Sequence, residues 1–121
     1  MKKLVLVFSL IALINCVKME DSSNFKDEYQ REICDKYSLY ANTMDVEGSM
    51  SLYAENAIVN GNGRVPLQGK EQIRKDFVEW YSSSESINHS AKVIAAHVSG
   101  NKAFAYGKWK VDQISKSGQR T

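Results

Sequence analysis

The sequence has few of the residues that organise disulfide-rich or metal-binding proteins. It contains two cysteines, Cys16 and Cys34, and two histidines, His89 and His97, among 121 residues. Cys34 and the histidines lack the spacing of a Cys/His zinc site, so we expect neither a metal nor a cofactor. Cys34 follows Ile33 in a helical pattern, which is typical of a small buried hydrophobic residue.

The sequence also lacks a long apolar run and an excess of charge. An apolar run at residues 4–14 is too short to span a bilayer as a helix. It follows Lys2 and Lys3, a pattern typical of a signal peptide, so we expect the chain to be exported. Without these two lysines, the other 14 of the 16 basic residues equal the 14 acidic ones in number. This balance indicates no nucleic-acid partner.

The apolar run ends in Leu-Ile-Asn-Cys, which resembles the lipobox of bacterial lipoproteins, with Cys16 as its cysteine. The resemblance implies a signal peptide over residues 1–16, a lipid on Cys16 and a place at a membrane of the bacterial cell envelope. Residues 17–26 then form a polar tether, and residues 27–121 form one domain. A secreted or periplasmic soluble form is the alternative. With a lipid on Cys16, Cys34 has no partner for a disulfide.

Helical periodicity predicts three helices. The first covers residues 27–43, and its inner face consists of Tyr29, Ile33, Tyr37, Tyr40, Ala41 and Met44. Asp45 is the expected N-cap of a short second helix that ends at Tyr53. The third begins after Gly69, with Ile73, Phe77 and either Trp80 or Tyr81 facing inward, and ends at Ser82 to Ser84.

The other segments read as strands and turns. Residues 56–60 predict a short strand, and residues 64–68, with the only proline, an edge strand or an irregular return. Two long strands are expected at residues 87–98 and 103–114. In the second, small residues, Trp109 and Val111 alternate with Phe104, Tyr106, Lys108 and Lys110. We expect these two lysines to form a solvated outer face and not an anion site.

Three motifs occur in the order of a known family: YSLYANTMDVEGSMSLYAENAIV, LQGKEQIRKDF and VSGNKAFAYGKW. Together they resemble the SnoaL-like branch of the nuclear transport factor 2-like superfamily. The resemblance implies an α+β, cone-like fold of three helices packed on a curved, mostly antiparallel sheet. This family usually adds one or two further strands, so we expect the sheet to be incomplete at its C-terminal end. Its members include ketosteroid isomerases, polyketide cyclases and dimeric structural modules, so the fold alone implies no reaction.

The resemblance to ketosteroid isomerase places Tyr37 where that enzyme has its oxyanion-binding tyrosine. The position of the catalytic base falls at Gly61, between Asn60 and Asn62. Neither glycine nor an amide accepts a proton at neutral pH. The sequence therefore offers no complete catalytic set, and we lean toward a protein that is not an enzyme.

His89 is the other acid–base candidate, because histidine titrates near neutrality. Its neighbours Asn88 and Ser90 favour an exposed place at the start of a strand, although the inner face of that strand would let His89 share a pocket with Tyr37. The candidate ligand pocket contains eight residues, namely Tyr37, Tyr53, Asn60, Phe77, Trp80, His89, Tyr106 and Trp109.

Three functions are compatible with these observations. The first is an exported, lipid-anchored domain that binds a small apolar or amphipathic molecule, or a protein partner. The second is an isomerase or cyclase that uses Tyr37 and His89. The third is a structural module that forms a homodimer through its sheet.

Overall fold

The computed structural model describes residues 22–61 and 63–121. The predicted signal peptide, the lipid site at Cys16, the first part of the predicted tether and Asn62 lie outside these residues. The first helix begins at Ser22, and residues 22–26 are therefore helical although the sequence indicated a tether. No helix among the described residues is long and apolar enough to cross a membrane.

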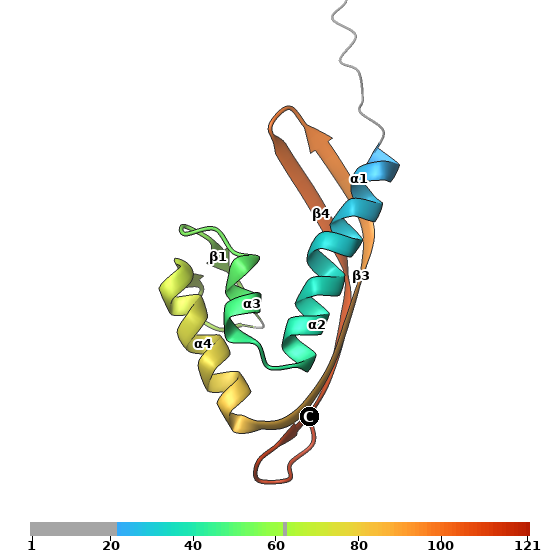
Figure 1. The fold of residues 1–121 in the computed structure, drawn as a ribbon. Helices are drawn as coiled ribbons and strands as arrows, with labels where there is room; N and C mark the ends of the chain where they lie inside the picture. Colours follow the sequence, from blue (N-terminus) through green and yellow to red (C-terminus); the bar gives the residue numbers. More distant parts are fainter. Residues whose placement is uncertain (1–21, 62) are drawn as a thin grey trace, which may run out of the picture.

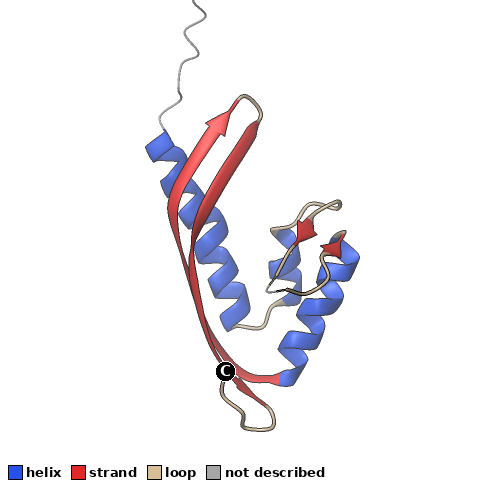
Figure 2. Cartoon of the chain, turned by 180° about the vertical axis from the view of Figure 1, so that it is seen from behind, coloured by secondary structure: helices blue, strands red, loops and turns tan. Residues whose placement is uncertain are grey.

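The molecule has two arms that meet at the junction of α4 and β3 (Figure 1). The long arm consists of a helical rod, made of α1 (Ser22–Tyr29), η1 (Gln30–Asp35) and α2 (Lys36–Asn42), which packs along a β-hairpin. The short arm contains α3 (Val46–Ser51), α4 (Lys70–Ser83) and a small sheet. In Figure 2, the long strands run the length of one arm and bend toward α4 at its base.

The rod and α3 are separated by a tight turn. Met44 adopts a left-handed conformation there, with φ of 54°, and ends the rod. Asp45 then caps α3, because its carboxylate accepts a hydrogen bond of 2.9 Å from the Gly48 N–H. The predicted N-cap and the short second helix are confirmed, and the helix ends at Ser51, two residues before the predicted end at Tyr53.

The long arm's hairpin consists of β3 (Ser84–Ser99) and β4 (Lys102–Ser115), paired antiparallel and joined by a turn in which Gly100 has φ of 59°. A bulge between Val93 and Ala95 moves the buried positions of β3 from odd to even residues. It explains why the sequence of this strand mixes two faces. We call the face toward the helical rod the inner face and the opposite one the outer face.

The small sheet of the short arm pairs β1 (Ile58–Val59) with β2 (Leu67–Gln68) and stays separate from the hairpin. Beyond β4, the predicted turn at residues 115–119 is present, and the Gln113 and Thr121 backbones exchange two hydrogen bonds of 2.9 and 3.0 Å. The α+β class and the helix and strand order predicted from the sequence are confirmed.

The hydrophobic core lies where the two arms meet. Its buried residues come from the rod, α3, α4 and β3, and are Ala41, Met50, Ile73, Phe77, Tyr81 and Ile87. Tyr81 is buried, while Trp80 is partly exposed, which decides between the two inward positions left open by the sequence. The Tyr81 hydroxyl is satisfied by Ser49 at 2.8 Å.

Candidate ligand-binding cleft

A cleft of about 690 Å³ opens between the two arms above this core. Its volume is in the range of small-molecule sites. Five of the predicted pocket residues line it, namely Tyr37, Tyr53, Trp80, His89 and Trp109. Nine further residues complete the lining: Ile33, Cys34, Arg64, Asp76, Glu79, Ser83, Ala91, Val111 and Gln113.

His89 lies on the inner face of β3 and is only 7% exposed, so the expectation of an exposed histidine was wrong. Its ring centroid lies 4.9 Å from that of Tyr37 and 6.3 Å from that of Trp109, on which it stacks at 12°. Strand alternation turns the His89 side chain toward the rod, whereas its neighbours Asn88 and Ser90 point outward. Tyr37 and His89 therefore do share one site.

The hydrogen bonds of Ser38 define the tautomer of His89. The Ser38 hydroxyl donates its only proton to the Cys34 carbonyl at 3.0 Å. It must therefore accept the hydrogen bond of 3.0 Å that joins it to His89 Nδ1. Neutral His89 thus carries its proton on Nδ1, and Nε2 is left with a free lone pair.

His89 Nε2 faces the cleft. None of the described residues makes a hydrogen bond with it, and the described part of the chain has no polar side-chain atom that is both buried and without a partner. The small exposure of His89 therefore includes Nε2, which opens to the cleft. Burial lowers the pKa of His89, which keeps the ring neutral and Nε2 an acceptor.

Two amide side chains of the rod hold His89 and the strand around it. Asn42 accepts from the His89 backbone N–H at 2.6 Å and donates to its carbonyl at 3.2 Å. One rod segment earlier, Gln30 donates to the Ala91 carbonyl at 3.0 Å and accepts from the Val93 N–H at 2.8 Å. These amides replace a neighbouring strand along the free edge of β3, which fixes the position of the imidazole.

Tyr37 and Tyr53 form a hydroxyl pair on the cleft wall. Burial is the main cause of the raised pKa of Tyr37, followed by the charges of nearby groups that include Tyr53 and Asp76. Burial also raises the pKa of Tyr53, whereas the hydrogen bond from Tyr37 lowers it. Both hydroxyls are therefore protonated at neutral pH.

Polar residues of α4 border the other side of the cleft. Asp76, which is partly exposed, pairs with the exposed Arg64 at 2.7 Å. The Trp80 indole N–H donates to the Gln113 side-chain oxygen at 2.9 Å, and Gln113 donates to the buried Ser84 hydroxyl at 2.8 Å. These contacts orient Trp80 and Gln113 at the base of the cleft.

Three predicted pocket residues do not line the cleft. Phe77 is buried in the core beneath the cleft, and its ring centroid lies 5.9 Å from those of Tyr37 and Tyr53. Asn60 is exposed beyond β1. Tyr106 is 51% exposed on the outer face of the hairpin, because alternation places it opposite Trp109.

The position expected for an isomerase base lies outside the cleft too. Gly61 is exposed, and apart from its chain neighbours no atom of the described residues lies within 4 Å of where its Cβ would be. Cys34 was expected to be buried but is a half-buried part of the cleft wall. Burial, and then the charge of Asp35, raise its pKa, so it remains a neutral thiol.

A helical signal identifies some of the lining residues that the sequence analysis missed. Asp76, Glu79, Trp80 and Ser83 have the spacing of one helix face, next to the core stripe of Ile73 and Phe77. This second stripe of α4 predicts a polar wall. Arg64 and Gln113 carried no such signal, because a loop and the end of β4 bring them to the cleft. No group of three or more potential metal-ligating residues occurs among the described residues.

This arrangement of two arms, a helical rod on an antiparallel hairpin and a cleft between them, defines the class: the chain has a nuclear transport factor 2-like (NTF2-like) fold. Among similar solved structures is one described as a putative dehydratase from the NTF2-like family of Streptomyces avermitilis. It has a TM-score of 0.56 and 14% identity, with 78% of this chain and 90% of that chain covered.

Two other similar structures have higher TM-scores. A conserved protein from Planctomyces limnophilus has a TM-score of 0.66 and 15% identity, and the match covers 80% of this chain and 72% of that chain. A protein of Novosphingobium aromaticivorans described as a putative aromatic ring hydroxylase has a TM-score of 0.64 and 17% identity. The match covers 80% of this chain and 71% of that chain. At these identities the likeness establishes the fold. No family model and no curated protein matches the sequence.

Proposed function

We propose that this chain is an exported domain, anchored by a lipid on Cys16, whose cleft binds a small, largely apolar molecule with a hydroxyl group. The observation that carries the ligand class is His89 Nε2, a neutral acceptor in a cleft lined by Tyr37, Trp80 and Trp109. The aromatic rings supply apolar contact, and the Nε2 acceptor selects a ligand that donates a hydrogen bond.

A pair of probes that differ only in the hydroxyl group tests this function. We expect 2-naphthol to raise the melting temperature of the protein more than naphthalene does, because only 2-naphthol donates to Nε2. The His89→Gln variant should lose most of this difference, and Trp109→Leu should reduce the rise in melting temperature with both probes. Tyr106→Leu is the matched control, because Tyr106 lies on the outer face, away from the cleft. Equal shifts with both probes, or none, would contradict the proposal.

The second candidate is an acid–base enzyme of the isomerase or cyclase type. It is favoured by the short distance of 4.9 Å between the Tyr37 and His89 rings and by the free lone pair on Nε2. In this function, His89 removes a proton next to a carbonyl, and the tyrosine pair stabilises the oxyanion. Deuterium exchange at the α-carbon of 2-tetralone, followed by NMR, tests it. Exchange that is no faster than in buffer, or that persists in His89→Gln, would exclude this role.

The anchor needs a separate test. Cys16→Ser should move the protein from the membrane fraction to the soluble fraction of the expressing bacterium. Unchanged fractionation would contradict the lipid on Cys16 and would leave the ligand proposal intact.

A further inference from the structure

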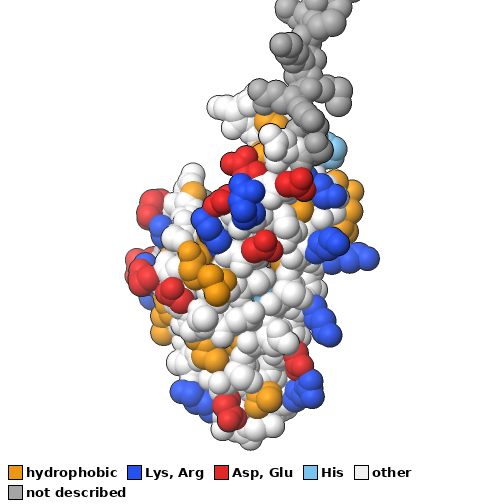
Figure 3. Space-filling view, turned by 45° about the vertical axis from the view of Figure 1, so that its right-hand side comes forward, with side chains coloured by type: hydrophobic (Ala, Val, Ile, Leu, Met, Phe, Trp, Pro, Cys, Tyr) orange, Lys and Arg blue, Asp and Glu red, His pale blue; other side chains and the backbone are white. Residues whose placement is uncertain are grey.

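The outer face of the hairpin carries an unusual set of exposed side chains. Three lysines, Lys92, Lys108 and Lys110, lie beside two exposed aromatic residues, Phe104 and Tyr106. We call these five residues the basic–aromatic face. Figure 3 shows blue and orange side chains next to one another along the right-hand edge of the molecule, on the side of the hairpin.

The lysines of this face form no ion pair within the described part of the chain. Lys92 lies directly opposite Lys108 in the antiparallel register, and Lys110 is the next residue on the same face of β4. Residues 87–111 contain four lysines and neither aspartate nor glutamate. On the adjacent rod, Glu32 pairs with Arg31 and Lys36.

This arrangement is unfavourable for the isolated chain. Like charges directly opposite each other on a sheet are destabilising. In the described structure, Asp112 lies close enough to Lys110 for the lysine to lower its pKa, but this carboxylate already pairs with Arg120. The sequence indicated a solvated face for Lys108 and Lys110, but the pairing with Lys92 depends on the hairpin register and was not predicted. A partner with many negative charges would turn the repulsion into binding energy.

The aromatic residues indicate what kind of anionic partner fits. Phe104 is 63% exposed and Tyr106 is 51% exposed, and their ring centroids lie 6.1 Å apart. Ile94, at the bulge, is 43% exposed. Apolar and aromatic side chains next to lysines are typical of surfaces that enter the headgroup region of a bilayer.

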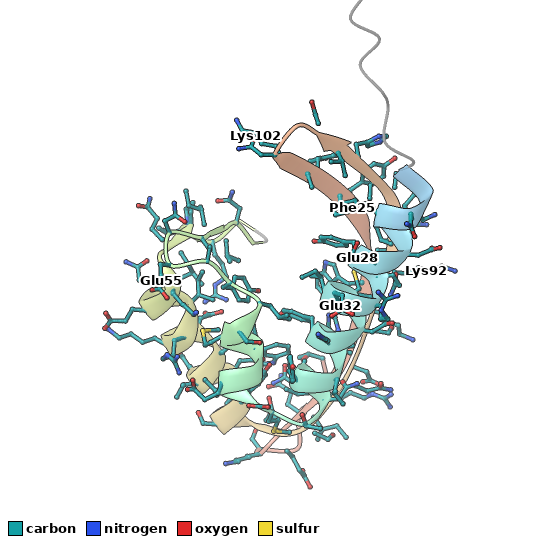
Figure 4. All side chains as sticks on the ribbon, turned by 45° about the horizontal axis from the view of Figure 1, so that its top comes forward. Phe25, Glu28, Glu32, Glu55, Lys92 and Lys102 are labelled. Atoms are coloured by element: carbon teal, nitrogen blue, oxygen red, sulfur yellow. The ribbon has the colours of Figure 1, made fainter. Side chains whose placement is uncertain are left out.

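The start of α1, which follows the predicted anchor in the sequence, lies beside the tip of the hairpin. Asn24 and Phe25 of α1 line a hollow there together with Gly100 and Lys102. Figure 4 shows Phe25 and Lys102 at this end of the long arm, and Lys92 pointing away from the cleft. Ser22 is six residues after Cys16, a separation of at most about 20 Å in an extended chain.

We propose that the basic–aromatic face docks on the surface of an anionic lipid bilayer. The lysines contact the headgroups, Phe104 and Tyr106 insert between them, and the cleft on the inner side of the hairpin stays open to the solvent. The docking depends on the outer face alone, so it is independent of the ligand proposed for the cleft.

Vesicle sedimentation tests the docking. The full chain with Cys16→Ser, which has no lipid, is mixed with two kinds of vesicle. One contains phosphatidylcholine alone, and the other contains about 30% phosphatidylglycerol as the anionic lipid. We expect tighter binding to the anionic vesicles. Each lysine near the surface contributes on the order of fivefold, so the triple variant Lys92→Gln, Lys108→Gln, Lys110→Gln should lose roughly a hundredfold of this preference.

A matched variant separates the face from overall charge. Lys70→Gln, Lys75→Gln, Lys116→Gln removes the same charge from α4 and the turn after β4, and should keep most of the preference. In about 0.5 M salt the Debye length is only a few ångströms, so the binding that remains is mainly apolar. The double variant Phe104→Ser, Tyr106→Ser should weaken this remaining binding. An equal loss in both lysine variants, or no loss in either, would overturn the proposal. Binding to single-stranded RNA that is tighter than binding to the anionic vesicles, and that depends on the same three lysines, would also overturn it.

Discussion

The two faces of the β3–β4 hairpin differ in chemistry although their residues alternate along the same strands. The inner face presents His89, Ala91 and Val93 to the helical rod and Trp109 to the cleft. The outer face presents Lys92, Lys108 and Tyr106 to the solvent. A short segment of sequence thus builds part of the cleft wall and a basic surface at once, because a strand turns successive side chains to opposite sides.

The largest loss of stability should come from a substitution at Gly107, where the inner face has no room for a side chain. A Cβ at Gly107 would lie 2.4 Å from the Lys92 carbonyl oxygen and 3.0 Å from Val93 Cα, both in the backbone of β3. Gly107→Ala must therefore push the strands apart, and we expect a loss of about 3 kcal/mol in the free energy of unfolding in urea. Gly61→Ala, with open space around its Cβ, is the control and should change stability by less than about 0.5 kcal/mol.

The next effect should come from Asn42, which secures the inner face to the rod. Asn42→Ala leaves the His89 N–H and carbonyl without their partner, so we expect a loss of about 2 kcal/mol in stability and faster hydrogen exchange at the His89 amide. Asn88→Ala, one residue earlier and exposed, should leave both measurements nearly unchanged. Similar losses in the two variants would mean that the two faces are equally important for stability.

A smaller effect should appear as a dependence on pH. Burial lowers the folded-state pKa of His89 below its ordinary value of 6.5, so the unfolded chain binds the proton more tightly. This contribution to stability is fully present above pH 6.5 and is lost as the pH falls through the folded-state pKa. We therefore expect the melting temperature to fall between pH 7.5 and 5, and His89→Gln to reduce the slope. His97→Gln, on the exposed outer side, is the control and should retain it.

The smallest effect concerns the outer face. Lys108→Glu converts the opposed pair with Lys92 into an ion pair, and we expect a gain of about 0.2–1 kcal/mol at low salt. Unfolding in 1 M salt should show little of this gain, because screening weakens exposed pairs. A loss of stability in Lys108→Glu would show that the two lysines do not repel each other.

The sequence predicted the elements of the fold better than the contents of the site. Helical spacing identified Ile73 and Phe77 as core residues, Asp45 as a cap and both long strands, because these patterns repeat locally. Tyr37, Trp80 and Trp109, named from the sequence as pocket candidates, line the cleft. His89 was expected at an exposed position because its polar neighbours suggested a surface, whereas its own environment depends on a helix about fifty residues away.

The sequence by itself predicted the order of the helices and strands, the core positions of α4, and that the lysines and Trp109 of β4 lie on opposite faces. Only the tertiary structure decided which face of the hairpin the rod covers, that Lys92 lies opposite Lys108, and that Asn42 and Ser38 fix the position and tautomer of His89. The physical reason is that periodicity is a local property of the backbone. Burial, register and hydrogen bonds between distant residues exist only once the two arms have packed.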